Sequence, residues 1–192
     1  MRTGLFGGTF DPPHTGHLIV AQDALTRLEL ARVVFIPAYE PPHKRGRDIS
    51  PAHLRLAMLR AALEGDDRFA VDDIEIRRGG TSYTVDTLRA LQAADPAAEL
   101  FLLLGTDQYE EIETWREPAE LRTLARIAVL SREGRHPVLR ADGASRVPVT
   151  RIDVSATEIR RRVAAGEPIR YLVPAAVESI IRQHRLYEPA SG

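Results

Sequence analysis

The sequence of 192 residues contains no cysteine and only one tryptophan. Disulfides and thiolate metal sites are therefore excluded, and a reducing compartment is permitted. Neither sign of charge is in excess, because 26 Lys and Arg residues stand against 27 Asp and Glu residues, which gives a formal net charge of −1. The overall positive charge that is typical of nucleic-acid-binding proteins is missing, so any anionic ligand has to be held by a local site.

Long apolar runs are missing as well. The longest, such as residues 101–104, are far too short to cross a bilayer, and residues 1–5 show no apolar signal region. We therefore expect a cytoplasmic protein with neither a membrane nor a nucleic acid as its partner. The length and the 44% of hydrophobic residues suit one domain over residues 1–192, in which residues 188–192 are expected to form a disordered tail.

Short apolar runs alternate with longer amphipathic segments along the chain. Strands are predicted at residues 3–6, 32–37, 69–76, 100–104, 127–130 and 149–154, and helices at residues 17–30, 51–63, 84–94, 156–165 and 175–184. Residues 131–148 are rich in Arg, Gly and Pro and are predicted to form a loop. Continuous apolar strands separated by helices indicate a doubly wound α/β fold with a mainly parallel sheet, followed by C-terminal helices. Its ligand site is expected at the carboxyl ends of the strands.

The first predicted strand runs into a turn that is rich in glycine and histidine, Gly7-Gly8-Thr9-Phe10-Asp11-Pro12-Pro13-His14-Thr15-Gly16-His17. Gly7 and Gly8 let the backbone approach a ligand closely, and the free N–H groups of the following helix favour phosphate. His14 and His17 are three residues apart, so both imidazoles can converge on one anion. Donors positioned in this way stabilise the charge that develops during transfer at phosphorus. A purely structural turn is the alternative, and a metal site lacks a third ligand nearby in the sequence.

A second predicted strand-to-helix junction comes late in the chain, around Ser155. Ser155 is expected to cap the helix, and Glu158 to complete a capping box. Capping explains neither Thr157 nor Arg160, because a cation in the first turn opposes the helix dipole. A cation at this position makes sense if an anion binds at the same end of the helix.

These two junctions resemble the HxGH and I-S-x-T-x-I-R motifs of nucleotidyltransferases. Three further segments are similar to those of bacterial nicotinate mononucleotide adenylyltransferases, namely Pro41-Pro42-His43-Lys44, Gly79-Gly80-Thr81-Ser82-Tyr83-Thr84-Val85-Asp86-Thr87-Leu88, and Gly105-Thr106-Asp107 with the later Trp115. The matching segments extend from Leu5 to Tyr187. The HxGH motif is specific only for the superfamily, whereas the other segments indicate the acceptor substrate.

The resemblance implies transfer of AMP from ATP to nicotinate mononucleotide, which gives deamido-NAD and pyrophosphate in NAD biosynthesis. It implies catalytic roles for His14, His17, Lys44 and Arg160. The ATP-binding residues that it implies are Gly7, Gly8, Thr9, Phe10, His14, His17, Gly105, Asp107, Ser155, Ala156, Thr157 and Arg160. The residues that it implies for binding nicotinate mononucleotide are Gly8, Lys44, Tyr83, Thr84, Val85, Asp107, Trp115 and Arg116. Mg²⁺ is expected to bind mainly through the ATP phosphates, without a metal site made by the protein.

One segment departs from the family. Members commonly have Arg-Pro-Gly where this chain has Arg132-Glu133-Gly134. The alternatives to the implied function are another adenylyl- or cytidylyltransferase and a sensor that binds ATP without turnover. The sequence does not decide between nicotinate and nicotinamide in the acceptor, and it does not fix the oligomeric state, although a homo-oligomer is compatible with it.

Overall fold

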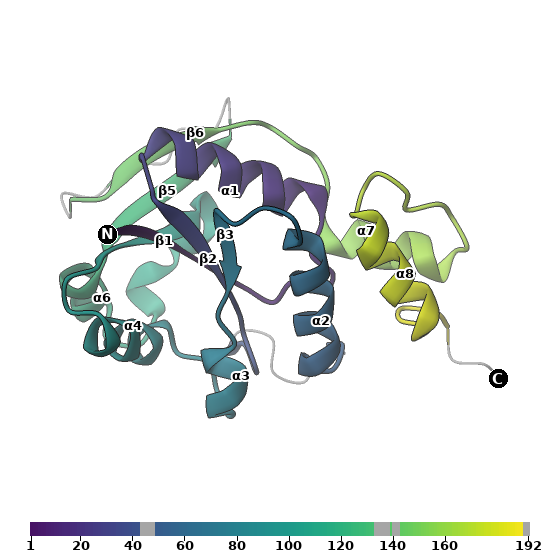
Figure 1. The fold of residues 1–192 in the computed structure, drawn as a ribbon, viewed down its shortest axis with the longest axis horizontal. Helices are drawn as coiled ribbons and strands as arrows, with labels where there is room; N and C mark the ends of the chain where they lie inside the picture. Colours follow the sequence, from purple (N-terminus) through teal and green to yellow (C-terminus); the bar gives the residue numbers. More distant parts are fainter. Residues whose placement is uncertain (43–48, 133–138, 140–142, 190–192) are drawn as a thin grey trace.

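Six parallel strands form one sheet in the computed structural model, which describes residues 1–42, 49–132, 139 and 143–189. The strands are β1 (Arg2–Gly8), β2 (Arg32–Pro37), β3 (Phe69–Val71), β4 (Glu99–Gly105), β5 (Arg126–Arg132) and β6 (Ser145–Val149). Their order in the sheet is β3-β2-β1-β4-β5-β6 (Figure 1). The chain builds outward from β1 to β3 and then returns to place β4 beside β1, which makes the gap between β1 and β4 a topological switch point. The predicted doubly wound α/β fold is confirmed.

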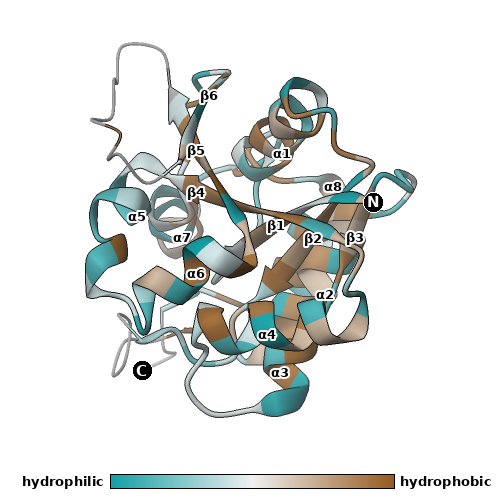
Figure 2. Cartoon of the chain, turned by 90° about the vertical axis from the view of Figure 1, so that its left-hand side faces the viewer, coloured by the Kyte–Doolittle hydropathy of each residue, from teal (hydrophilic) through white to brown (hydrophobic). Residues whose placement is uncertain are grey.

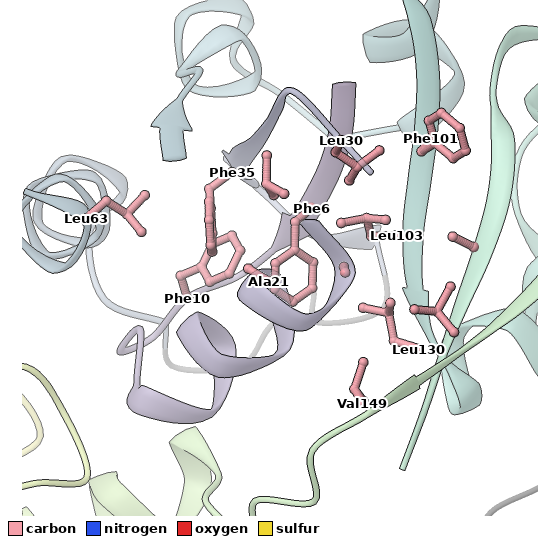
Figure 3. Packing of buried hydrophobic residues seen from close by; sticks show 14 of the residues in the cluster. Phe6, Phe10, Ala21, Leu30, Phe35, Leu63, Phe101, Leu103, Leu130 and Val149 are labelled. Atoms are coloured by element: carbon pink, nitrogen blue, oxygen red, sulfur yellow. The ribbon is translucent and has the colours of Figure 1, made fainter. Parts of the chain in front are cut away.

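Helices cover both faces of the sheet because successive residues of each strand point to opposite sides. On one face, Phe6, Phe101 and Leu103 pack against α1 (Thr15–Arg27) and α2 (Ala52–Leu63), and Figure 3 shows this cluster. On the other face, Leu102 and Leu104 belong to a second cluster. The helices of that side are α4 (Thr84–Ala94), α5 (Thr106–Glu110) and α6 (Pro118–Leu124). Figure 2 shows hydrophobic residues along the strands and hydrophilic residues on outward parts of the helices.

The C-terminal helices form a smaller unit on the outer side of α2. A third cluster joins Met58 of α2 to Ile159 of α7 (Ala156–Ala164) and to Val177 and Ile181 of α8 (Ala175–Gln183). These two helices lie to one side of the sheet in Figure 1. Because α7 is anchored by this apolar contact, its first turn is held near the loop that follows β1.

The predicted strand at residues 69–76 is wrong in its second half. β3 ends at Val71, and the chain then forms the short helix α3 (Ile74–Arg78). The cause is a local turn, since the side chain of Asp72 accepts a hydrogen bond from the N–H of Ile74 at 2.9 Å. Asp side chains compete in this way with the ladder bonds that a strand needs.

The predicted strand at residues 149–154 is also displaced, because β6 covers Ser145–Val149. The N–H of Thr150 leaves the sheet and donates to Oδ2 of Asp23 on α1 at 2.6 Å. The predicted loop at residues 131–148 therefore contains the end of β5 and most of β6, and its residues 133–138 and 140–142 lie outside the described residues. Short helices between β4 and β5, α5 and α6, were not predicted.

Two remaining expectations concern the tail and membranes. Residues 188 and 189 have no regular secondary structure, and residues 190–192 of the expected disordered tail lie outside the described residues. None of the helices in the described part of the chain combines the length and the apolar character that a membrane span requires.

Leu103 provides a test of the packing on the central strand β4. Its side chain is 0% exposed and lies in the cluster between the sheet and α1. We expect Leu103→Ala to lower the free energy of unfolding by about 3 kcal/mol, because it removes buried methyl groups and leaves a cavity. The same change at Leu139, which is 36% exposed, should cost less than about 0.5 kcal/mol. Urea unfolding of both variants checks this, and equal losses would contradict the assignment of the core.

Candidate active site

A pocket of about 400 Å³ lies at the carboxyl ends of β1, β2 and β4. This is the edge of the sheet, beside the switch point, where the fold predicts a ligand. Its wall contains residues from the ends of all three strands, from the start of α4 and from the segment after α5. They include Gly7, Gly8, Thr9, Ala38, Pro41, Pro42, Tyr83, Thr84, Trp115 and Arg116.

The two histidines of the first junction lie against each other. His14 is the N-cap residue of α1 and is 7% exposed. Its backbone N–H donates to Nδ1 of His17 at 3.2 Å, and the two rings stack with their centroids 3.7 Å apart. Because Nδ1 of His17 accepts this bond, the proton of the neutral ring belongs on Nε2.

Two glycines make room for the rings of this junction. A Cβ atom on Gly16 would lie 3.1 Å from Nδ1 of His14, and a Cβ atom on Gly8 would lie 2.9 Å from the ring of Phe10. Phe10 in turn holds the imidazole of His17, with ring centroids 5.1 Å apart. Since the Phe10 side chain is only 3% exposed, its ring supports the histidine from the core side and only its backbone can meet a ligand.

At the second junction the predicted cap is present, but the capping box is not. Oγ of Ser155 accepts the backbone N–H of Glu158 at 3.1 Å. The carboxylate of Glu158 does not return to the cap, because it accepts hydrogen bonds from Arg161 and Arg162, each at 2.9 Å. These two arginines lower the pKa of Glu158 to about 2. The expectation of a complete box was therefore wrong, and Glu158 forms ion pairs on the surface of α7.

Arg160 joins the two junctions. Its guanidinium donates to the backbone oxygen of Asp11 at 2.7 Å and to Oγ1 of Thr157 at 3.3 Å. On the other side of the same loop, the N–H and the hydroxyl of Thr15 both donate to the backbone oxygen of Leu172 at 3.0 Å. The loop before α1 is thus held between the first turn of α7 and the segment before α8. The two junctions that the sequence singled out, separated by about 140 residues along the chain, lie side by side.

The predicted site residues fall into two adjoining groups. Gly8, Tyr83, Thr84, Trp115 and Arg116 lie on the pocket wall. Outside the wall, at the two junctions, lie His14, His17, Ser155, Ala156, Thr157 and Arg160. Gly7, Gly8 and Thr9 connect the two groups, because they line the pocket and lead directly into the histidine loop.

Three of the predicted residues belong to neither group. Gly105 and Asp107 lie at the start of α5, where Gly105 is the N-cap residue and Asp107 is exposed, and neither is part of the pocket wall. Val85 is 1% exposed and packs in the core. Lys44 lies outside the described residues, as do Glu133 and Gly134 of the segment that departs from the family.

Aromatic side chains shape the mouth of the pocket. Trp115 lines the wall and also packs against the second core cluster, so its side chain belongs to both the pocket and the core. The guanidinium of Arg116 lies over the ring of Tyr83 at 4.9 Å from its centroid and pairs with Asp86 at 3.5 Å. Such cation–π contacts hold an aromatic ring in one orientation.

Arg55 is a buried residue of the site that sequence reasoning missed. Its side chain is 1% exposed, and its guanidinium donates to four backbone oxygens, at 2.7–3.0 Å, from Thr9, Ala38, Tyr39 and Ser50. Burial lowers its pKa, and the charge of Asp11 opposes that shift. A signal was present in the sequence, because Arg55 lies three and four positions before Met58 and Leu59, on the apolar stripe of a predicted helix.

Asp11 was the second residue missed. Its carboxylate is 4% exposed and accepts hydrogen bonds from the N–H of Ser50 at 3.1 Å and from the hydroxyl of Tyr187 at 2.6 Å. Burial and the charge of Asp11 raise the pKa of Tyr187, so the phenol stays neutral and donates its proton to the carboxylate. Tyr187 is 176 residues away along the chain, and no local pattern could reveal this partner.

Comparisons with known proteins agree with this geometry. A family model described as cytidylyltransferase-like matches residues 5–162. A protein of Thermomicrobium roseum is 47% identical over 97% of this chain and 91% of its own length, and one of Thermus thermophilus is 44% identical over 97% and 100%. Both carry the name "probable nicotinate-nucleotide adenylyltransferase". The fold is shared with Plasmodium falciparum nicotinic acid mononucleotide adenylyltransferase complexed with NaAD, at a TM-score of 0.78, 16% identity and 97% coverage of both chains.

Arg55 can be tested against an arginine on the outside of the same helix. We expect Arg55→Met to lower the free energy of unfolding by about 3 kcal/mol, because it strips one buried and three partly buried carbonyl groups of their donor. Arg60→Met is the matched control, since Arg60 is exposed and forms one ion pair, with Asp73 at 3.1 Å. Its cost should stay below about 1 kcal/mol. Urea unfolding measures the free energy of unfolding of both variants. Similar losses in the two would show that the hydrogen bonds of Arg55 contribute little to stability.

Proposed function

The chain belongs to the cytidylyltransferase-like family and, within it, to the nicotinate-nucleotide adenylyltransferases, and we propose that it transfers AMP from ATP to nicotinate mononucleotide. The products are deamido-NAD and pyrophosphate. The observation that carries the proposal is the contact between Arg160 and Asp11, which brings two helix N-termini together beside the pocket. The imidazoles of the first junction, the guanidinium of Arg160 and the N-terminal end of α7 then lie around one place, as a polyphosphate requires.

The chemistry needs no nucleophilic side chain. A phosphate oxygen of nicotinate mononucleotide attacks the α-phosphorus of ATP, a new P–O bond forms, and the bond from that phosphorus to the oxygen of the β-phosphate breaks. Pyrophosphate leaves with the electron pair of the broken bond. Negative charge grows on the leaving oxygens, so donors that are already in position lower the barrier. His14, His17 and Arg160 are the donors that we assign to this role.

The neighbouring pocket is assigned to the acceptor. Its volume of about 400 Å³ lies in the range of sites that enclose small molecules. The ring surface of Trp115 suits an aromatic pyridine, and the start of α4 at Thr84 offers free backbone N–H groups to the carboxylate of nicotinate. Gly8 and Thr9 lie between the two groups, where the phosphate of the acceptor would meet the α-phosphate of ATP.

Mg²⁺ would enter with ATP. Among the described residues, no group of three His, Cys, Asp or Glu side chains is arranged to hold a metal ion, and the buried carboxylate of Asp11 is already bonded to Ser50 and Tyr187. This set of residues fits an ion that is held by phosphate oxygens and water, as is usual for Mg²⁺. When bound, the ion neutralises charge on the phosphates, and the chain's own residues position the reacting groups.

A pyrophosphate-release assay tests the function. We expect release from ATP that depends on nicotinate mononucleotide, with deamido-NAD as the product by chromatography. Parallel reactions contain nicotinamide mononucleotide, phosphopantetheine or no acceptor. Equal rates with and without nicotinate mononucleotide would refute the proposal, and a faster rate with phosphopantetheine would reassign the acceptor.

A substitution at His17 can distinguish a structural role at the start of α1 from a role in catalysis. In His17→Asn, the amide oxygen can still accept the N–H of His14, but the donor at Nε2 is lost. We expect kcat to fall by about 10²–10³-fold, the usual effect of losing one donor to a developing charge, with little change in the KM of ATP. His184→Asn, on an exposed residue after α8, is the control and should retain full activity. An unchanged kcat in His17→Asn would remove His17 from catalysis.

A further inference from the structure

A buried acid lies in the wall of the acceptor pocket, and the reaction described above does not use it. Glu75 of α3 is 7% exposed and lines the pocket. Its Oε1 accepts the hydroxyl of Thr87 at 2.7 Å, and the hydroxyl of Ser82 lies close to the same carboxyl group. Burying a carboxyl group costs free energy unless it gains hydrogen bonds. Burial raises the pKa of Glu75, and the bonds from Thr87 and Ser82 oppose that shift.

The direction of these hydrogen bonds follows from the other partners of the two hydroxyls. Oγ of Ser82 accepts the backbone N–H of Tyr39 at 2.9 Å, and Oγ1 of Thr87 accepts from the guanidinium of Arg78 at 3.1 Å. The Thr87 hydroxyl therefore has its proton left for an acceptor, and Oε1 of Glu75 at 2.7 Å is nearer than the oxygen of Tyr83 at 3.4 Å. The carboxyl group of Glu75 is the acceptor of this bond.

The same two hydroxyls enclose the residues that begin α4. Ser82 comes directly before Tyr83, the N-cap residue, and Thr87 lies in the first turn after Thr84. The backbone N–H of Ser82 also donates to the oxygen of Glu40 at 3.0 Å, which ties the turn to the loop after β2. Glu75 of α3 is thus tied to the first turns of α4 through Thr87.

We infer that Glu75 is a specificity-determining positioning residue for the acceptor. Through Thr87 it keeps the first N–H groups of α4 aimed at an anionic substituent on the ring of the bound mononucleotide. The inference rests on the proposed function. Glu75 need not touch the substrate, because the Thr87 hydroxyl transmits its effect to the backbone that does.

Glu75 could affect the acceptor in a different way, through its charge, and the two effects have opposite signs. A carboxylate in the pocket wall repels a second carboxylate on the ligand. If charge were its main effect, neutralising Glu75 would tighten the binding of nicotinate mononucleotide. If positioning is its main effect, the same change weakens binding, because charge-assisted hydrogen bonds to the helix start lose their alignment.

Four variants test this inference. Thr87→Val removes the hydroxyl while keeping the shape, and Thr87→Ser retains it. Glu75→Gln keeps the size of the side chain but removes its negative charge, so the bond from Thr87 is no longer charge-assisted. Glu64→Gln, at the exposed end of α2, is the control. For each protein, kcat and the KM values of ATP, nicotinate mononucleotide and nicotinamide mononucleotide are measured, and thermal melting confirms folding.

We expect Thr87→Val and Glu75→Gln to raise the KM of nicotinate mononucleotide about tenfold, the effect of one unsatisfied buried group. The KM of ATP and kcat should change less than about twofold, and Thr87→Ser and Glu64→Gln should resemble the wild type. The ratio of kcat/KM for the nicotinate over the nicotinamide acceptor should fall. Equal KM values in Thr87→Val and Thr87→Ser, or tighter nicotinate binding by Glu75→Gln, would overturn the inference.

Failure of the proposed function would look different. A wild-type protein that forms no dinucleotide from either acceptor would refute that function. Amide hydrogen exchange at residues 84–88 then decides the inference without any substrate. Faster exchange in Thr87→Val but not in Thr87→Ser would support the positioning role, and equal exchange in both would refute it.

Discussion

The site depends on one buried guanidinium. The last hydrogen bond of the sheet between β1 and the segment after β2 runs from the N–H of Ala38 to the oxygen of Gly8 at 2.9 Å. Beyond this bond the segments after β1 and β2 separate beside the pocket. Their carbonyl groups therefore lack the hydrogen-bond donors that a neighbouring strand would supply. Arg55 replaces those partners, because its N–H groups reach the oxygens of Thr9, Ala38 and Tyr39. Burying an unpaired cation costs free energy, and these hydrogen bonds compensate that cost for the guanidinium of Arg55.

Asp11 extends this constraint to the far end of the chain. Its charge balances that of Arg55, its carboxylate receives the hydroxyl of Tyr187, and its backbone oxygen receives Arg160. The first and last parts of the sequence therefore meet at one residue of the histidine loop. This arrangement explains how a chain with a net charge of −1 can form a local cationic site, since the buried acid compensates the buried base while Arg160 stays partly exposed.

Sequence reasoning succeeded where the cause of the structure was local or repeated. Continuous apolar runs such as that of β4 identified the parallel sheet, and the pattern around Ser155 identified the N-cap of α7. It failed where a single side chain redirected the backbone, as Asp72 does after β3 and Asp23 does after β6. The partners of Asp11, at positions 50, 160 and 187, could not be predicted, because a hydrogen bond between distant segments leaves no periodic pattern. Arg55 was recognisable as an anomaly on an apolar stripe, but its four carbonyl partners were not.

Two polar networks hold the site, and only the first, through the bond from Arg160 to Asp11, includes a donor that we assign to the transfer itself. The network of Arg55 and Asp11 holds the loop after β1, and that of Glu75 holds the start of α4. Between them lie Gly8 and Thr9, where the two substrates of the proposed reaction would meet. In-line attack tolerates little misalignment, so the distance between the two networks matters as much as the groups that touch phosphate. Both networks are anchored to the sheet, through the loops after β1 and β2, and a parallel sheet packed on both faces is the most rigid part of such a fold. The buried charges of Arg55, Asp11 and Glu75 therefore fix the loops that carry the site to the rigid sheet.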